Sequence, residues 1–263
     1  MMGTIKKGSV VSRKSYNNDI IFYVDDINNK RSAENLAILK GITIRIMADS
    51  PVDDLNVCDK RAIKDLDIYD NKFEINDKLY GRTNVRYGKI LHLDGDKRYS
   101  EKTETYYRKH KLNYVVKHVA EIKQAQVIKD LLRKYNPDIV VFTGHDAIIK
   151  KNKGVNDLNN YRNSKYFVKA VIEARKWNSN CNELVIFAGA CQSYYEALIS
   201  VGANFASSPA RILIDFIDPL VVAEEVATTT KDKIITMSDL EHKIRNGRMA
   251  VSGIGATGKK IVI

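Results

Sequence analysis

Cysteine, proline and tryptophan are scarce in this chain of 263 residues, which has three, four and one of them respectively. Cys58, Cys181 and Cys191 are odd in number and show no Cys-x-x-Cys spacing, which excludes a disulfide framework and a zinc ribbon. No apolar run approaches the roughly 20 residues of a membrane helix, and the first residues lack the apolar region of a signal peptide. We therefore expect an intracellular chain with reduced thiols.

Signals for a metal or a cofactor are also missing. His110 and His118 show no metal-ligand spacing with Cys58 or Cys181. The segment 253–258 fits Gly-x-Gly-x-x-Gly, but with only five residues after it (263 minus 258) it has neither the helix nor the distant acid of a dinucleotide site. We expect a flexible turn at 255–260, where GATGKK lacks the Ser or Thr of a phosphate loop, and no metal or cofactor.

The charge of the chain is strongly positive, with 43 Lys and Arg against 32 Asp and Glu and a formal net charge of +11. The basic residues are spread along the chain with acids between them, so they indicate a solvated basic surface and do not specify nucleic acid as a partner.

Residues 1–52 predict a small β-barrel-like module of short strands separated by Asn, Asp and Gly. Strands are expected at 8–11, 20–24 and 42–47, where Ile42, Ile44 and Ile46 alternate with polar residues at the period of a half-buried strand. Residues 53–86 are charged and weakly periodic, and we interpret them as a linker.

Residues 87–263 predict an α/β domain, because strand and helix patterns alternate. Strands are expected at 88–96, 112–116, 138–146, 183–189 and 203–209, and helices at 119–135, 164–177, 194–201 and 219–229. This order favours a mostly parallel sheet flanked by helices. In such folds functional sites gather at the carboxyl ends of the strands.

Two of the predicted strands end in the same way. DIVVFTGHD delivers His145 after a glycine, and ELVIFAGACQS delivers Cys191 after another. If the strands are neighbours, the imidazole and the thiol share one edge of the sheet. A helix beginning near Gln192 or Ser193 would favour the thiolate through its dipole and offer backbone N–H groups to an oxyanion.

These residues alone leave a structural role open. Cysteine is among the most buried residue types, and a single Cys or His after a strand most often serves packing. The matched endings of the two strands support a catalytic pair.

The spacing of this pair resembles that of caspases, in which His lies about 50 residues before a Gln-Ala-Cys motif. His145 precedes Cys191 by 46 residues (191 minus 145), and the cysteine stands in Ala190-Cys191-Gln192. In caspase-like and clostripain-like peptidases the His is followed by Gly, whereas here Gly144 precedes it and Asp146 follows. The backbone N–H of Asp146 would then be the oxyanion donor beside the His.

Longer segments resemble the YabG family of sporulation-specific proteases over nearly the whole chain. They are GSVVSRKSYNNDIIFYV, VVFTGHDA, FAGACQSYYEALISVGANFASSPARI, DPLVVAEEVATT and MSDLEHKIRNG. The resemblance implies a caspase-like cysteine endopeptidase of the mother cell, in its cytoplasm or on the spore coat, that cleaves spore coat and germination-related proteins after Arg. It implies Cys191 as the nucleophile, His145 as the general acid/base, and Asp146 in support.

A pocket for Arg requires a carboxylate, because a guanidinium pairs best with a bidentate acid. The strand-end candidates are Asp94, Asp96, Asp146, Asp215 and Asp218, and the sequence does not choose among them.

Two other readings of the chain remain open at this stage. One is a non-catalytic α/β binding module whose basic surface engages nucleic acid or coat polymers. The other is a different thiol enzyme, an acyltransferase or amidase, built on the same pair.

Overall fold

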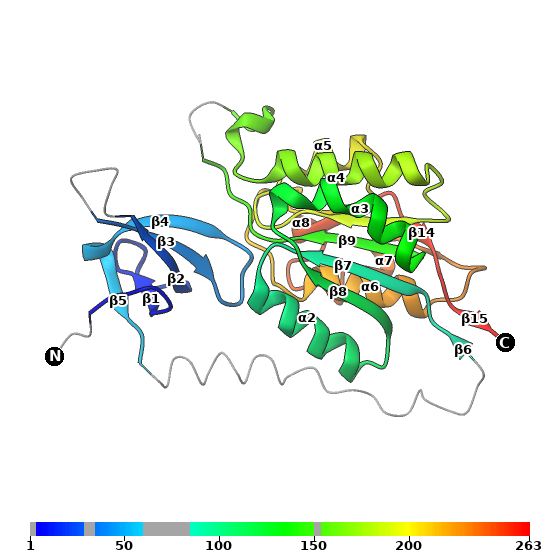
Figure 1. Cartoon of the computed structure of the whole chain (residues 1–263), viewed down its shortest axis with the longest axis horizontal. Helices are drawn as coiled ribbons and strands as arrows, with labels where there is room; N and C mark the ends of the chain where they lie inside the picture. The colour runs from blue at the N-terminus through cyan, green and yellow to red at the C-terminus, as the bar shows by residue number, and fades with distance from the viewer. Residues whose placement is uncertain (1–3, 29–34, 60–84, 150–153) are drawn as a thin grey trace. The chain divides into compact units, whose positions relative to one another are not determined.

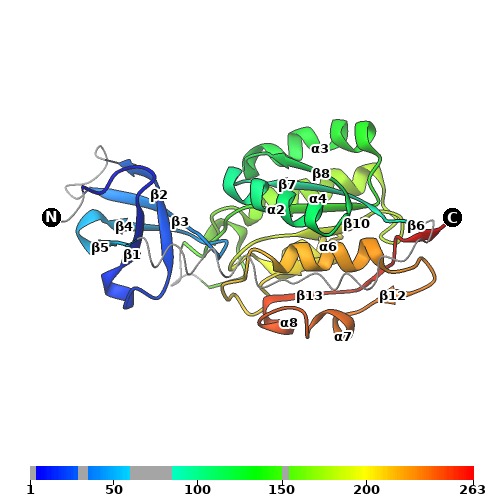
Figure 2. The ribbon, with the colours of Figure 1, turned by 90° about the horizontal axis from the view of Figure 1, so that it is seen from below.

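A computed structural model describes residues 4–28, 35–59, 85–149 and 154–263. The chain divides into two compact units, Met1–Leu79 and Tyr80–Ile263. The first unit holds an antiparallel sheet, and the second a mostly parallel sheet with helices on both faces (Figures 1 and 2). This confirms the predicted fold class.

The first unit is a five-stranded antiparallel sheet in the order β4-β3-β2-β1-β5. A small apolar core lies on it, formed by Val11, Phe22, Val24, Ala37, Leu39 and Leu55. The strands are β1 (Val10–Arg13), β2 (Ile21–Asn28), β3 (Leu36–Gly41), β4 (Met47–Pro51) and β5 (Leu55–Val57).

The predicted strand at 42–47 is wrong. Strand β3 ends at Gly41 and β4 begins at Met47, so only the last residue of the predicted strand lies in one. The chain reverses between them: Gly41 N donates to Ile46 O at 3.0 Å, and Ile46 N donates to Ile44 O at 2.8 Å. A Cβ at Gly41 would lie 2.2 Å from Ile44 O, so glycine permits the tight reversal. Alternating isoleucines followed the strand period without forming a strand.

Strand β5 pairs with β1 and carries the sheet to Val57, beyond the module end predicted at residue 52. Residues 60–84 of the predicted linker lie outside the described residues. Two 3-10 turns accompany the sheet, Lys14–Tyr16 and Val52–Asp54.

The second unit contains a six-stranded sheet in the order β13-β11-β10-β9-β7-β8. Five strands are parallel, and β13 (Val251–Gly253) runs antiparallel to β11. The parallel strands are β7 (Lys89–Asp94), β8 (Asn113–His118), β9 (Ile139–Thr143), β10 (Val185–Ala188) and β11 (Phe205–Ser207). They fall within or close to the predicted ranges.

Helices cover both faces of this sheet (Figure 1). On one face lie α3 (Glu121–Tyr135), α4 (Ser164–Trp177) and α5 (Tyr195–Ser200). Their apolar side chains pack on Leu91, Val140 and Ile186 and on their strand neighbours. On the other face lie α2 (Lys97–Lys109) and α6 (Asp218–Thr228).

Helix α2 is absent from the sequence prediction because it is mostly charged. It buries only Tyr99, Ser100, Thr103 and Tyr107, and the side chain of Asp96 caps its first turn by accepting from Arg98 N and Tyr99 N. Asp and Asn are preferred at this position because their oxygen satisfies an orphan N–H of the helix start. The cap places Asp96 at the carboxyl end of β7.

Two small sheets complete the unit. Strand β6 (Val85–Arg86) pairs with β15 (Ile261–Val262), and β12 (Ile234–Ile235) pairs with β14 (Ala256–Thr257). The flexible turn predicted at 255–260 is therefore wrong, since β14 lies within it. Short helices α7 (Met237–Leu240) and α8 (Gly247–Ala250) and the 3-10 turn Leu158–Asn160 lie in connections. Within the described segments no helix is long and apolar enough to cross a membrane.

Candidate active site

His145 and Cys191 occupy equivalent positions on neighbouring parallel strands. Phe142 of β9 is in register with Ala188 of β10, and the ladder continues with Gly189 N donating to Phe142 O at 3.0 Å. Each site residue lies three positions beyond its member of this pair. The register thus brings the two predicted residues to one edge of the sheet, on the side of the strands that faces α2 and α6.

The residues that follow them connect the two strand ends directly. Ser193 Oγ donates to Asp146 Oδ2 at 2.9 Å, and Ile148 N donates to Gln192 Oε1 at 3.2 Å. Two hydrogen bonds therefore join the segment that follows the imidazole to the segment that follows the thiol.

His145 is buried and held by its backbone and its ring. Its N–H donates to Glu121 Oε1 at 2.8 Å, and its carbonyl accepts from Asn163 Nδ2 at 2.6 Å. The ring lies 5.3 Å from that of Tyr99, centroid to centroid, and its Nε2 is 3.0 Å from Asp96 Oδ2. These contacts hold the backbone of His145 and orient its ring with Nε2 toward Asp96.

Gly144 makes room for the Glu121 carboxylate that holds His145. A Cβ at Gly144 would lie 2.2 Å from Glu121 Oε1, and a Cβ at Gly95 would meet the same carboxylate at the same distance. A side chain at position 144 would therefore displace the Glu121 carboxylate that accepts from His145 N. Glu121 itself was not identified from sequence, because it reads as an ordinary acid in the first turn of a helix.

Cys191 is fully buried three residues beyond the end of β10, beside Ile214. Ile214 N donates to its Sγ at 3.3 Å, and the thiol lies 3.6 Å from Ile214 O. The next residue, Gln192, has a left-handed φ of 55°. Such a conformation in a non-glycine residue is held by its surroundings and is often found at functional sites.

The helix expected near Gln192 or Ser193 begins later, at Tyr195, and has six residues. The N–H groups of the intervening turn are already used: Gln192 N donates to Ile212 O at 3.1 Å, Ser193 N to Ala190 O at 3.3 Å, and Tyr194 N to Ser164 Oγ at 2.8 Å. The helix therefore begins later than predicted, and the three N–H groups of the turn after Cys191 donate within the fold. Ser193, within this turn, and Ser164, at the start of α4, both donate to Asp146 Oδ2.

Asp146 is a buried centre of four hydrogen bonds. Its Oδ1 accepts from Ala147 N and Asn163 N, and its Oδ2 accepts from Ser164 Oγ and Ser193 Oγ. Ser193 Oγ also accepts from Ala190 N at 2.9 Å, so Asp146 is connected through Ser193 to Ala190, the residue before Cys191. Burial raises the pKa of Asp146 to about 6 against the lowering effect of these donors.

We predict that Asp146 makes stability fall as pH rises from about 4 to about 6. Its pKa is 3.8 in the unfolded chain and about 6 in the fold, so in this window the folded state keeps a proton that the unfolded state loses. The loss amounts to about 3 kcal/mol. Urea unfolding of the wild type and Asp146→Asn between pH 3.5 and 7 measures it, since groups common to both proteins cancel. Parallel stability curves for the two proteins would contradict the shift.

The candidate acids for an Arg pocket separate into two groups. Asp94 accepts from Thr143 Oγ1 at 2.9 Å and from Asp96 N at 2.8 Å, Asp96 contacts His145, and Asp146 contacts the two serines. Asp215 and Asp218 lie just after Ile214, whose backbone contacts the Cys191 sulfur, and Asp215 N donates to Asp218 Oδ2 at 3.0 Å. Only this second group belongs to the segment that contacts the thiol.

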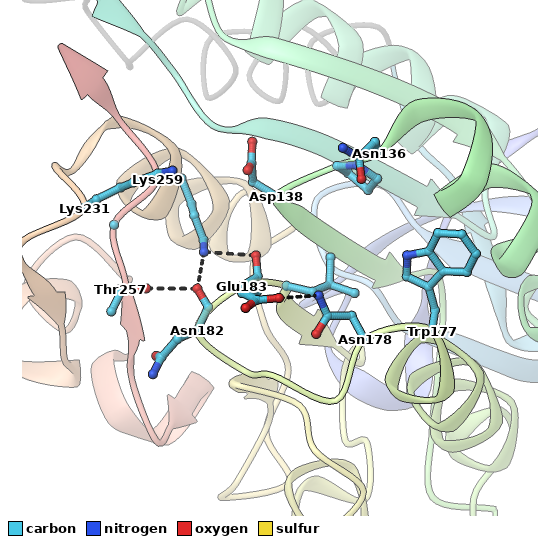
Figure 3. A pocket seen from close by; sticks show the side chains of 12 residues that line it. Asn136, Asp138, Trp177, Asn178, Asn182, Glu183, Lys231, Thr257 and Lys259 are labelled. Atoms are coloured by element: carbon cyan, nitrogen blue, oxygen red, sulfur yellow. Dashed lines mark hydrogen bonds between the residues drawn. The ribbon is translucent and has the colours of Figure 1, made fainter. Parts of the chain in front are cut away.

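A cavity of about 360 Å³ lies at the opposite end of the sheet (Figure 3). It is lined by residues just before β9 and β10, among them Asp138 and Glu183, and by Lys259, whose Nζ donates to Glu183 O at 3.0 Å. None of its lining residues is Cys or His. Across the described parts of the chain, no group of three or more His, Cys, Asp and Glu is placed to hold a metal ion.

The structure thus has a buried thiol and a buried imidazole at adjoining strand ends of an α/β sheet, the edge at which sites gather in such folds. The comparisons give the class of protein: the model of the family described as YabG peptidase U57 matches residues 6–84 and 70–262. The chain is also 37% identical over 271 residues to the sporulation-specific protease YabG of Bacillus subtilis (strain 168), covering 94% of this chain and 92% of that protein. The chain belongs to the YabG peptidase family. It is therefore a peptidase, which removes the non-catalytic alternative.

Proposed function

We propose that the chain is a cysteine endopeptidase in which Cys191 is the nucleophile and His145 the general acid/base. The observation that carries this proposal is the matched position of the two residues, each three residues beyond a registered pair of β9 and β10. A hydrogen bond from Ser193 to Asp146 joins the two segments that follow them. A thiol and an imidazole on one rigid edge are the parts that acyl transfer through a thioester requires.

The reaction proceeds in two steps. The Cys191 thiolate attacks the scissile carbonyl carbon, and His145 delivers a proton to the leaving amine as the C–N bond breaks. Water, deprotonated by the same imidazole, then attacks the thioester and releases the acid and the thiol.

We assign the oxyanion contact to the backbone N–H of Asp146. It follows directly after His145, whereas the N–H groups of Gln192, Ser193 and Tyr194 donate within the fold. The carboxylate of Asp146 holds Ser164 and Ser193 and so keeps this backbone in place. Gly144, Ala190 and Gln192 shape the same two turns.

We assign the recognition of an Arg side chain to Asp215 and Asp218. Their segment touches the nucleophile through Ile214, so a side chain next to the scissile bond would lie close to their charge. The other three candidates hold groups of the strand ends. Asp215 and Asp218 accept backbone N–H groups of their own segment, those of Ile217 and Asp215. The substrates we propose are spore coat and germination-related proteins, processed in the mother cell during sporulation.

Peptides that differ only in the residue before the scissile bond test this specificity. We expect kcat/KM to be highest for Arg, lower for Lys, and at least about 100-fold lower for Ala or Glu, because an acidic pocket pairs bidentately with a guanidinium. Mapping the cleaved bond by mass spectrometry separates a peptidase from a side-chain amidase. Equal rates for Arg and Ala would remove the assignment to Asp215 and Asp218.

A further inference from the structure

We infer that Asp96 is a positioning residue, which fixes the ring and the proton of His145 for catalysis. This inference rests on the proposed function, because it gives His145 its third partner. Its basis is the contact between Asp96 Oδ2 and His145 Nε2 at 3.0 Å, with the ring fully buried and the carboxylate nearly so.

Asp96, His145 and Cys191 stand in one row across three parallel strands. Leu93 of β7 is in register with Phe142 of β9, which is in register with Ala188 of β10. Each member of the row lies three residues beyond its member of that set. The sheet therefore presents an acid, an imidazole and a thiol in consecutive order at one edge, and no flexible loop is needed to assemble them.

Two sets of contacts fix the Asp96 carboxylate. Its Oδ1 accepts from Arg98 N at 2.8 Å and from Tyr99 N at 3.4 Å as the cap of α2. Its own N–H donates to Asp94 Oδ1 at 2.8 Å. Because Oδ1 serves the helix cap, Oδ2 is the oxygen that faces the imidazole.

Asp94 is itself anchored in a buried polar chain. Its Oδ2 accepts from Thr143 Oγ1 at 2.9 Å, and Thr143 Oγ1 lies 2.7 Å from His92 Nε2. His92 Nδ1 contacts Tyr107 Oη of α2 at 2.9 Å. The backbone of Asp96 is thus held from both the sheet and the helix, as a ring-orienting carboxylate requires.

The contact with Asp96 decides which ring nitrogen reacts. An ionised carboxylate only accepts, so Nε2 carries the hydrogen, and in neutral His145 the lone pair is on Nδ1. Nδ1 is buried and has no hydrogen-bond partner among the described residues. It is the atom available to exchange a proton with the thiol and the leaving amine, and the carboxylate stabilises the imidazolium that forms.

Asp96→Asn tests the inference because asparagine keeps the helix cap. The amide oxygen replaces Oδ1 at the Arg98 and Tyr99 N–H groups, and the amide nitrogen then faces His145 Nε2 as a donor. The hydrogen of the ring is forced onto Nδ1, the atom that must accept. We expect kcat to fall about 10²- to 10⁴-fold with KM within about twofold, since the ground-state contacts of the substrate are unchanged.

Asp157→Asn is the matched control, because Asp157 caps the turn Leu158–Asn160 with its side chain and does not contact His145. It should keep full activity.

Nitrogen-15 NMR of the His145 ring, recorded in full-length protein with Cys191→Ala, should show the hydrogen on Nε2 with Asp96 and on Nδ1 with Asn. An unchanged kcat or an unchanged tautomer in Asp96→Asn would overturn the inference. A peptidase that stays active without Cys191 or His145 would instead overturn the proposed function.

Discussion

Cys191→Ala is expected to abolish peptide cleavage and to leave the fold intact. The nucleophile of a covalent mechanism has no substitute, so kcat should fall about 10⁴-fold or more. The thiol is small and fully buried, and its loss leaves a minor gap beside Ile214 that costs about 1 kcal/mol of unfolding free energy. Hydrolysis of an Arg-containing peptide and thermal unfolding, measured on the same preparation, check both parts.

Cys181→Ala provides the control for this variant. Cys181 is a free, partly exposed cysteine, and its sulfur makes only long contacts of 4.0 Å to backbone carbonyls. Its removal should leave the rate unchanged. If Cys181→Ala lost activity and Cys191→Ala kept it, the nucleophile would be misassigned.

His145→Gln should reduce kcat about 10³-fold, which makes it the second largest expected effect. The glutamine amide can still donate to Asp96, so the buried carboxylate keeps a partner and the fold is retained, but the side chain cannot exchange a proton near neutral pH. Steady-state kinetics with folding checked by circular dichroism measures the loss.

His110→Gln is the matched substitution elsewhere in the unit. His110 follows α2, stacks on Tyr106 at 4.1 Å between centroids, and contacts Glu224 through Nδ1 at 2.8 Å. We expect it to lower stability modestly and to leave kcat as it is. Equal kinetic losses in the two variants would mean that His145 acts on stability alone.

The candidate site could be located from sequence because it depends on local patterns. An apolar run followed by glycine predicts where a buried strand ends. Helices that alternate with such strands predict a parallel sheet, in which the carboxyl ends of the strands meet at one edge. The strands β9 and β10 and the helix between them confirm that part. Their register depends on ladder pairing, which one sequence does not reveal.

Asp96 shows what sequence reasoning could not supply. It was one of five candidate acids for an Arg pocket, and only the cap of α2 and the distance to His145 Nε2 indicate a different role. Helix α2 was missed because its buried stripe consists of two tyrosines, a serine and a threonine. Without that helix, nothing in the chain separates Asp96 from Asp94.

The strand predicted at 42–47 failed for a related reason. Isoleucines at every second position are typical of a strand with one buried face. A turn can carry the same alternation when a glycine, here Gly41, allows the backbone to reverse tightly. Strand β3, which does pair with β2, has the less regular sequence LAILKG. Pairing partners, rather than periodicity alone, decided which segment became the strand.

The central claim is that β9 and β10 present an imidazole and a thiol to each other, and the separation of Cys191 Sγ from His145 Nδ1 in a crystal structure of the full chain measures it most directly. We predict about 3 to 6 Å, a distance that allows proton exchange after slight closure on substrate. Side chains that point to opposite faces of the sheet, or a third residue standing between them, would contradict the account.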